Sequence, residues 1–146
     1  MTTTYTDDKP YQILDQPIYH LCEKPLWEEA KEVYYPPTFE QDGKITHAGM
    51  HVEKLLGSAN HFYKSRQAEW ICVEINPNIL VENGIQTMVE SPANVGATSA
   101  ERVTIRYPHI HGGIPKTILN LVTNVYPMIR SPDGTFNEIP GITDQK

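Results

Sequence analysis

The strongest pattern of hydrophobic and polar positions lies between residues 52 and 63. Apolar side chains recur there with helical spacing, at Val52, Leu55, Leu56, Ala59, Phe62 and Tyr63. Charged and polar residues fill the opposite side, which predicts an amphipathic helix that packs one face on a sheet. A second helix is predicted over 25–35, "PLWEEAKEVYY", because proline opens the segment and Trp27, Ala30 and Tyr34 share one helical face.

Alternation with a period of two predicts strands in the other apolar segments. In "WICVEIN" (70–76), Ile71, Val73 and Ile75 alternate with the residues between them, and a proline follows. The other strand candidates are "IYHL" (18–21), "IQTMVE" (85–90), "RVTIRY" (102–107) and, although it also fits a helical period, "TILNLVTNVYPMI" (117–129). Strands scattered among two helices predict an α+β domain with an antiparallel or mixed sheet.

Length, composition and charge limit the classes of protein to consider. A chain of 146 residues suits one domain, and we expect a flexible tail over 1–16, a single α+β domain over 17–140 and a second tail over 141–146. The net charge of −6, without a run of Lys and Arg, argues against a nucleic-acid partner. Neither a membrane span nor a secretory signal pattern occurs, so we expect a cytoplasmic protein without a membrane partner, monomeric or weakly homo-oligomeric.

Six histidines raise the question of a metal site. His109 and His111 would point to the same side of a strand, and His47 and His51 would share one side of a helix if that helix already included residue 47. However, neither an HExxH motif nor a CxxC pair is present, and the regular strand series of a jelly roll is missing. We assign no metal ligand, and a histidine-based metal enzyme stays an alternative.

Sequence motifs of nucleophilic catalysis and of phosphate binding, such as GxSxG and the P-loop, are also missing. What remains is a set of polar side chains at the ends of predicted strands, namely His20, His47, Glu90 and His109. If they converge, imidazoles that titrate near neutrality and one carboxylate form a cleft suited to acid–base chemistry. In "YPHIHGG" (107–113), the proline stiffens the strand and the glycines let the backbone approach a ligand closely. We therefore predict that this segment forms one wall of a pocket.

Seven segments between Pro17 and Pro140 resemble, in the same order, the family called domain of unknown function nine-five-two. They are "IYHL", "YYPPTFEQDGKITHAG", "HFYK", "CVEINPNIL", "MVE", "YPHIHGG" and "YPMIRSPDGTFNEIP". That family resembles the ADP-ribosyltransferase superfamily in fold. The resemblance implies two small antiparallel sheets that face each other as a split barrel with flanking helices, and an NAD-sized cleft between them. NAD is implied as a ligand by this fold resemblance only.

The resemblance also implies roles for individual residues. Tyr19-His20 resembles the first-strand pair whose histidine holds the ribose attached to nicotinamide, and Glu90 matches the acid that stabilises an oxocarbenium-like centre. The residues that we expect to contact a ligand are Tyr19, Tyr63, Arg66, His111 and Gly112. The family has Cys-Ser after the histidine where this chain has Ala48-Gly49, and it has Tyr in place of His111. These departures predict a pocket with a different ligand preference.

Two functions of different classes follow from these patterns. The first is an enzyme that acts on an NAD-like nucleotide or another small polar metabolite, with His20 positioning the ligand and His47, His109 or Glu90 transferring protons. The second is a non-catalytic protein that binds such a small molecule. Fold resemblance does not establish chemistry, so both hypotheses stay open at this point.

Overall fold

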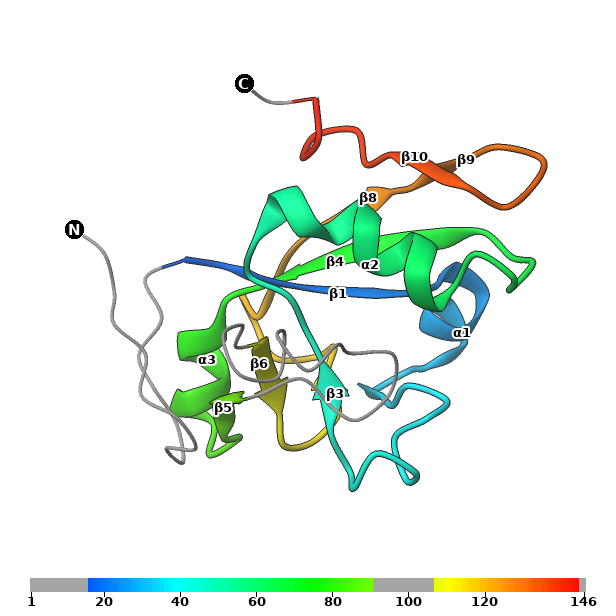
Figure 1. Ribbon diagram of the computed structural model, residues 1–146. Helices are drawn as coiled ribbons and strands as arrows, with labels where there is room; N and C mark the ends of the chain where they lie inside the picture. The colour runs from blue at the N-terminus through cyan, green and yellow to red at the C-terminus, as the bar shows by residue number, and fades with distance from the viewer. Residues whose placement is uncertain (1–15, 91–106, 145–146) are drawn as a thin grey trace.

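A three-stranded antiparallel sheet in the order β1-β4-β8 runs through the middle of the protein (Figure 1). The computed structural model describes residues 16–90 and 107–144. The strands of this central sheet are β1 (Ile18–Glu23), β4 (Trp70–Ile75) and β8 (Val122–Pro127). All six residues of β1 pair with β4. Because β4 lies between two strands and carries apolar side chains on both faces, both sides of this sheet are covered by other elements.

Three smaller antiparallel sheets surround the central one. β3 (Thr46–His47), β6 (Tyr107–Ile110) and β5 (Thr87–Glu90) form a sheet in that order, β2 (Val33–Tyr34) pairs with β7 (Ile114–Pro115), and β9 (Ile129–Arg130) pairs with β10 (Phe136–Glu138). The strands of the described residues do not close a barrel. The predicted α+β class with small antiparallel sheets is thus confirmed.

Helix α1 (Lys24–Glu29) is shorter than predicted. The prediction of helix up to residue 35 was wrong, since Ala30 is extended and Val33 and Tyr34 form β2. A contact at its end accounts for the early end. The Lys116 ammonium group donates to the carbonyl oxygens of Trp27 (2.6 Å) and Ala30 (2.7 Å) at the end of α1.

The predicted helix over 52–63 is present as a 3₁₀ turn, η1 (Val52–Lys54), followed by α2 (Leu55–Phe62). A further helix, α3 (Pro77–Glu82), was not predicted. Its start carries recognisable signals, because the Asn76 side chain accepts a hydrogen bond from the backbone N–H of Asn78 and Pro77 occupies the first helical turn.

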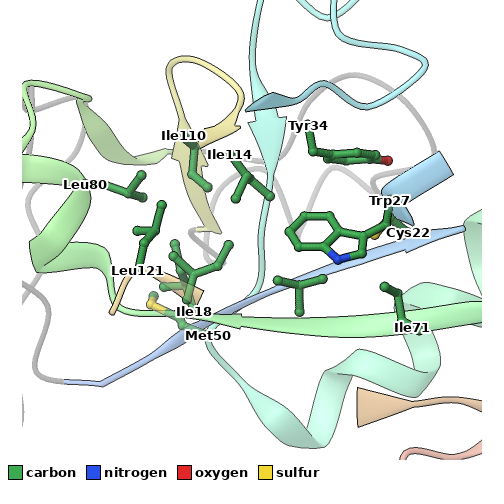
Figure 2. Close-up of a cluster of buried hydrophobic side chains, with 12 residues drawn as sticks. Ile18, Cys22, Trp27, Tyr34, Met50, Ile71, Leu80, Ile110, Ile114 and Leu121 are labelled. Carbon is green, nitrogen blue, oxygen red and sulfur yellow. The ribbon is translucent and has the colours of Figure 1, made fainter. Parts of the chain in front are cut away.

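The two faces of the central sheet pack against two separate hydrophobic clusters. The first cluster lies between this sheet and the β2, β6 and β7 region (Figure 2) and contains Ile18, Cys22, Trp27, Tyr34, Met50, Ile71, Val73, Ile75, Leu80, Ile110, Ile114 and Leu121. The second lies under α2 and the β9-β10 hairpin and contains Tyr19, Leu21, Leu55, Ala59, Trp70, Cys72, Met128, Phe136, Ile139 and Ile142. Since side chains alternate along a strand, His20 shares the face of Ile18 and Cys22 and points toward the first cluster.

The ends of the chain differ in how far the structure describes them. Most of the tail expected over 1–16 lies outside the described residues. At the other end, Ile142 belongs to the second cluster although we expected a tail from residue 141. Within residues 16–90 and 107–144, none of the helices has the length and apolar character needed to cross a bilayer.

Candidate functional site

Strands from two different sheets meet beside the N-terminal half of β1. Tyr19 and Gly49 exchange two backbone hydrogen bonds, of 2.8 and 2.7 Å, and the Ala48 N–H donates to the Pro108 carbonyl oxygen over 3.1 Å. The segment after β3 therefore contacts both β1 of the central sheet and β6 of the neighbouring sheet. We call this region the sheet junction, and its geometry brings histidines from three strands together.

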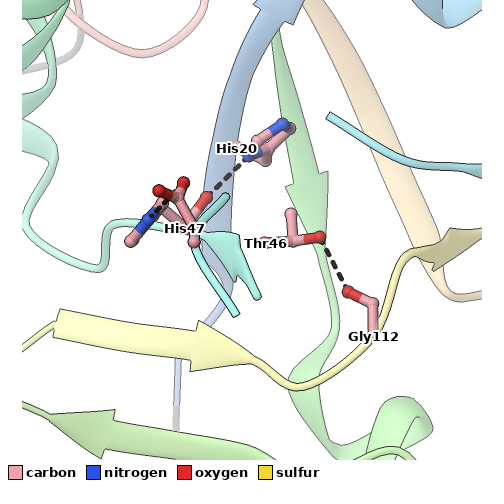
Figure 3. Close-up of polar contacts among 5 residues, drawn as sticks. His20, Thr46, His47 and Gly112 are labelled. Atoms are coloured by element: carbon pink, nitrogen blue, oxygen red, sulfur yellow. Dashed lines mark hydrogen bonds and ion pairs between the residues drawn. The ribbon is translucent and has the colours of Figure 1, made fainter. Parts of the chain in front are cut away.

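His20 of β1 lies inside the junction. Its Nδ1–H donates to the backbone carbonyl oxygen of His47 over 2.6 Å (Figure 3). The other ring nitrogen, Nε2, is buried without a hydrogen-bond partner among the described residues. Burial lowers the pKa of His20 to about 4. The ring is therefore neutral at pH 7, with its proton on Nδ1 and an unshared electron pair on Nε2.

His47 and His109 are partners in the pairing of β3 with β6. Their rings meet edge to face with centroids 4.8 Å apart, and His109 is 5% exposed. His47 Nε2 donates to a carboxylate oxygen of Asp42 over 3.0 Å. The result is a row of Asp42, His47 and His109, with the partly exposed His47 in the middle and the buried His109 at one end. Sequence analysis missed Asp42, whose one local signal is its Asp-Gly turn shortly before His47.

An open cleft of about 670 Å³ lies next to this row. Its volume falls within the usual range of small-molecule sites, about 300–1,000 Å³. One wall is the loop over 35–44, which we call the loop wall, and the other is the turn over 111–113, the turn wall. The lining residues are Tyr35, Pro36, Pro37, Phe39, Glu40, Lys44, His111, Gly112 and Gly113. The cleft therefore combines aromatic rings with two basic side chains and one carboxylate.

Local backbone geometry gives the cleft its shape. In the loop wall, Gly43 and Lys44 both have positive φ angles, 83° and 64°, and the Lys44 N–H donates to the Phe39 carbonyl oxygen over 2.7 Å. In the turn wall, a Cβ atom on Gly113 would lie 2.6 Å from the Tyr34 carbonyl oxygen. Glycine is thus required where the turn wall passes β2.

The structure brings together some of the residues that the sequence analysis selected. His20, His47 and His109 meet at the junction, but none of them is among the residues that line the cleft. His111 and Gly112 do line it. Lys44, Tyr35 and Phe39 were not selected as site residues, because spacing along the chain does not reveal which loop folds next to which turn.

The remaining selected residues have other contacts. The Tyr19 hydroxyl donates to Glu74 over 3.2 Å, the Tyr63 ring stacks on Trp70 at 4.4 Å, and Arg66 forms a 2.8 Å ion pair with Glu23. None of these three lines the cleft. The backbone of Glu90 pairs with Tyr107 at the end of β5. The side chain of Glu90 lies outside the described part of the structure.

Glu74 of β4 is the centre of a separate polar group on the central sheet. Its carboxylate accepts hydrogen bonds from the side chains of Tyr19, Thr123, Asn124 and Tyr126, at 2.7 to 3.2 Å. Partial burial raises the pKa of Glu74, but these hydrogen bonds outweigh that effect and hold the pKa below its ordinary value. This carboxylate is therefore ionised at pH 7 and joins β1, β4 and β8.

The histidines do not form a metal site within the described residues, where no three His, Cys, Asp or Glu side chains gather closely enough to hold an ion. The helical pairing considered for His47 and His51 is not formed. His47 lies in β3, and His51 is extended and precedes η1, with its ring 3.8 Å from Glu53.

Comparison with known proteins shows the fold and does not show a family. No family model and no curated protein matches the chain. The structure is similar to crystal structures of protein CC0527 from Caulobacter crescentus and of a double mutant of that protein, with TM-scores of 0.61 and 0.60 and sequence identities of 18% and 17%. Each match covers 84% of this chain and 94% of the other. At these identities the similarity concerns the fold alone.

Proposed function

We propose that the protein binds a small molecule with a planar ring and an anionic group in the cleft between the loop wall and the turn wall. One observation carries the proposal, namely that aromatic rings, basic side chains and glycine backbone line the same open cleft. Tyr35 and Phe39 offer ring surface, with their own centroids 4.9 Å apart. Lys44 and His111 supply donors for an anion.

We propose further that the chain is a member of the family called domain of unknown function nine-five-two, with the ADP-ribosyltransferase-like fold. The seven ordered segments support this, as does the presence of two antiparallel sheets that meet at the junction. An NAD-like nucleotide is then the first ligand class to test, since it has both a planar base and phosphates. Its ring would stack on the aromatic side chains, and its phosphates would contact Lys44.

An enzyme is the second candidate function, and the row of Asp42, His47 and His109 favours it. A carboxylate that accepts a hydrogen bond from an imidazole fixes the ring and stabilises its charged form, which suits a general base. Binding without turnover is nevertheless the function that the geometry supports best. His20 and His109 are buried and do not line the cleft, so their rings do not reach a ligand held there.

A thermal-shift series with NAD, ADP-ribose, AMP and inorganic phosphate tests the binding proposal. A ligand at 100 times its dissociation constant stabilises the folded state by about 2.7 kcal/mol. We expect a shift with at least one nucleotide, and its loss in Lys44→Ala. Lys54→Ala is the matched control, because Lys54 is an exposed lysine outside the cleft. The absence of any shift, or an equal shift in Lys44→Ala, would contradict the proposal.

A turnover assay then separates the two functions. The nucleotide that binds is incubated with the protein and analysed by chromatography and mass spectrometry. We expect it to be recovered unchanged, as a binding protein requires. Release of nicotinamide or another product, abolished in His47→Asn, would instead establish the enzyme.

A further inference from the structure

The peptide group between Gly112 and Gly113 is fixed in orientation from inside the protein. Thr46 of β3, which is completely buried, donates from Oγ1 to the carbonyl oxygen of Gly112 over 2.7 Å (Figure 3). This peptide bond is trans, like the others that the structure describes. In a trans peptide the N–H group points in the direction opposite to the C=O group. The N–H of Gly113 therefore points away from Thr46.

The N–H of Gly113 is an unused hydrogen-bond donor. Gly113 is buried, but its N–H donates to no acceptor among the residues that the structure describes. Buried backbone N–H groups without a partner are rare, because the hydrogen bond that they lose to water is left uncompensated. Since glycine has no side chain, Gly113 contributes backbone atoms to the lining of the cleft. A ligand in the cleft can supply the missing acceptor.

The surroundings of Gly113 indicate which kind of acceptor fits. A Cβ atom on Gly113 would lie 2.8 Å from Cδ1 of Tyr35, so the bare backbone of the turn wall lies directly beside that ring. Lys44 lines the same cleft from the loop wall, and its ammonium group forms no ion pair among the described residues. A backbone N–H and an unpaired ammonium group in one cleft are the donors that an oxyanion requires.

We propose that the Gly113 N–H and the Lys44 ammonium group together bind a phosphate group of the ligand, beside the Tyr35 ring. The inference rests on the proposed function and assigns the subsite of its anionic group. The N–H donates to one phosphate oxygen, and Lys44 offsets the negative charge. Glu40, the carboxylate in the same lining, repels the phosphate and so limits its affinity.

Titration of the isotope-labelled protein with inorganic phosphate, at constant ionic strength and followed by NMR, tests the subsite without a ring. We expect the Gly113 amide proton to move downfield and to saturate with roughly millimolar affinity, because a hydrogen bond to an oxyanion deshields it. The amides of Gly84 and Gly134 are internal controls, since they already donate to the carbonyl oxygens of Val81 and Ser131. A Gly113 shift no larger than theirs, or one that does not saturate, would overturn the inference.

Substitutions of opposite charge effect test the second donor. Lys44→Ala should weaken phosphate binding by about tenfold or more, whereas Glu40→Gln should strengthen it by about two- to fivefold, because a repulsive charge is removed. Lys44→Asn is a second variant in case alanine alters the loop, since Lys44 has a positive φ angle that asparagine adopts readily. Lys54→Ala, outside the cleft, should leave the affinity unchanged. Unchanged affinity in both Lys44 variants, or weaker binding in Glu40→Gln, would contradict the assignment.

The failure of this inference can be distinguished from the failure of the proposed function. If phosphate moves the Gly113 amide but no nucleotide binds more tightly than phosphate alone, the subsite stands and the planar ring of the proposed ligand is refuted. If a nucleotide binds without moving the Gly113 amide, the cleft holds its ligand through other groups and the phosphate subsite is refuted.

Discussion

The imidazole of His20 hydrogen-bonds the backbone carbonyl of His47 over 2.6 Å, and this bond joins the central sheet to β3. The bond fixes the proton on Nδ1, while the electron pair on Nε2 is buried without a partner among the described residues. A buried group in this state accepts a proton only with difficulty. The junction is therefore held by a neutral histidine, and protonation of this ring opposes folding.

We predict that His20 makes the protein sensitive to mild acid. Burial lowers the pKa of His20 to about 4 in the folded state, and an unfolded histidine has a pKa of about 6.5. As the pH is lowered, the unfolded state thus binds a proton before the folded state does. The contribution of His20 to the free energy of unfolding is therefore fully present above the unfolded pKa and falls as the pH decreases toward 4. The slope approaches about 1.4 kcal/mol per pH unit for one proton. Urea unfolding at pH 7.5, 5.5 and 4.5 measures it.

His20→Asn is the matched variant for this prediction, because its amide can replace the Nδ1–H donor and does not titrate. The variant should be less stable than the wild type at pH 7.5 but lose less stability between pH 7.5 and 4.5. Carboxylates titrate equally in both proteins, so the difference between the two curves isolates His20. Parallel curves would show that the ring is protonated as easily in the folded as in the unfolded state.

We predict that Gly113→Ala destabilises the protein and displaces the turn wall. The new Cβ atom would lie 2.6 Å from the Tyr34 carbonyl oxygen and 2.7 Å from the Val33 side chain, so β2 or the turn must move. Overpacking of this kind costs about 1–3 kcal/mol. Gly57→Ala, in α2, is the control: no atom lies within 4 Å of its added Cβ, and alanine favours helix by about 1 kcal/mol. Urea unfolding should show a lower free energy of unfolding than the wild type for Gly113→Ala and a higher one for Gly57→Ala.

The sequence predicted helices and strands best where one face of the segment packs on a hydrophobic core, because burial of that face produces a regular hydrophobic pattern. The alternation in β4 and the apolar face over 52–63 both identified real elements, because each packs on a core cluster. The helix over 25–35 was predicted too long, since the local pattern does not show that Val33 and Tyr34 pair with β7 or that Lys116 binds the end of α1. Helix α3 was missed because its capping signals lie in a segment too short for a clear period.

The site was harder to predict than the fold. Sequence analysis selected His20, His47 and His109 as strand-end groups, and the bridge between Tyr19 and Gly49 places them at one junction. It did not show that two of these rings would be buried instead of lining a cleft. It also missed Asp42 and Lys44, because their relation to β3 and to the turn wall depends on how a loop packs. Such contacts between distant segments leave no periodic signal.

We predict that Glu74→Gln weakens the contact between β1, β4 and β8 at neutral pH. The carboxylate accepts four hydrogen bonds, whereas the glutamine amide would present N–H groups to some of the same donors. Loss of hydrogen bonds at a partly buried group costs about 1–3 kcal/mol. Since the folded pKa of Glu74 is lowered, the contribution is present above the unfolded pKa and is lost as the pH falls through the folded one. The free energy of unfolding of the wild type should exceed that of Glu74→Gln by more at pH 7 than at pH 3. An equal difference at both pH values would contradict this account.

We predict that Lys44 and Arg66 differ sharply in their importance for ligand binding. Both are exposed basic residues, and Arg66 was the one selected from the sequence. The structure pairs Arg66 with Glu23, away from the lining of the cleft, whereas Lys44 lines it. Loss of one charge-assisted bond to a phosphate weakens binding by about tenfold or more, since such bonds are worth about 1.5–3 kcal/mol. Calorimetric titration with the nucleotide that gives the largest thermal shift should therefore show this loss in Lys44→Ala. Arg66→Ala should change the affinity by less than about twofold, or about 0.4 kcal/mol, because Arg66 does not line the cleft. The reverse order would place the ligand beside the end of α2 and refute the cleft as the binding site.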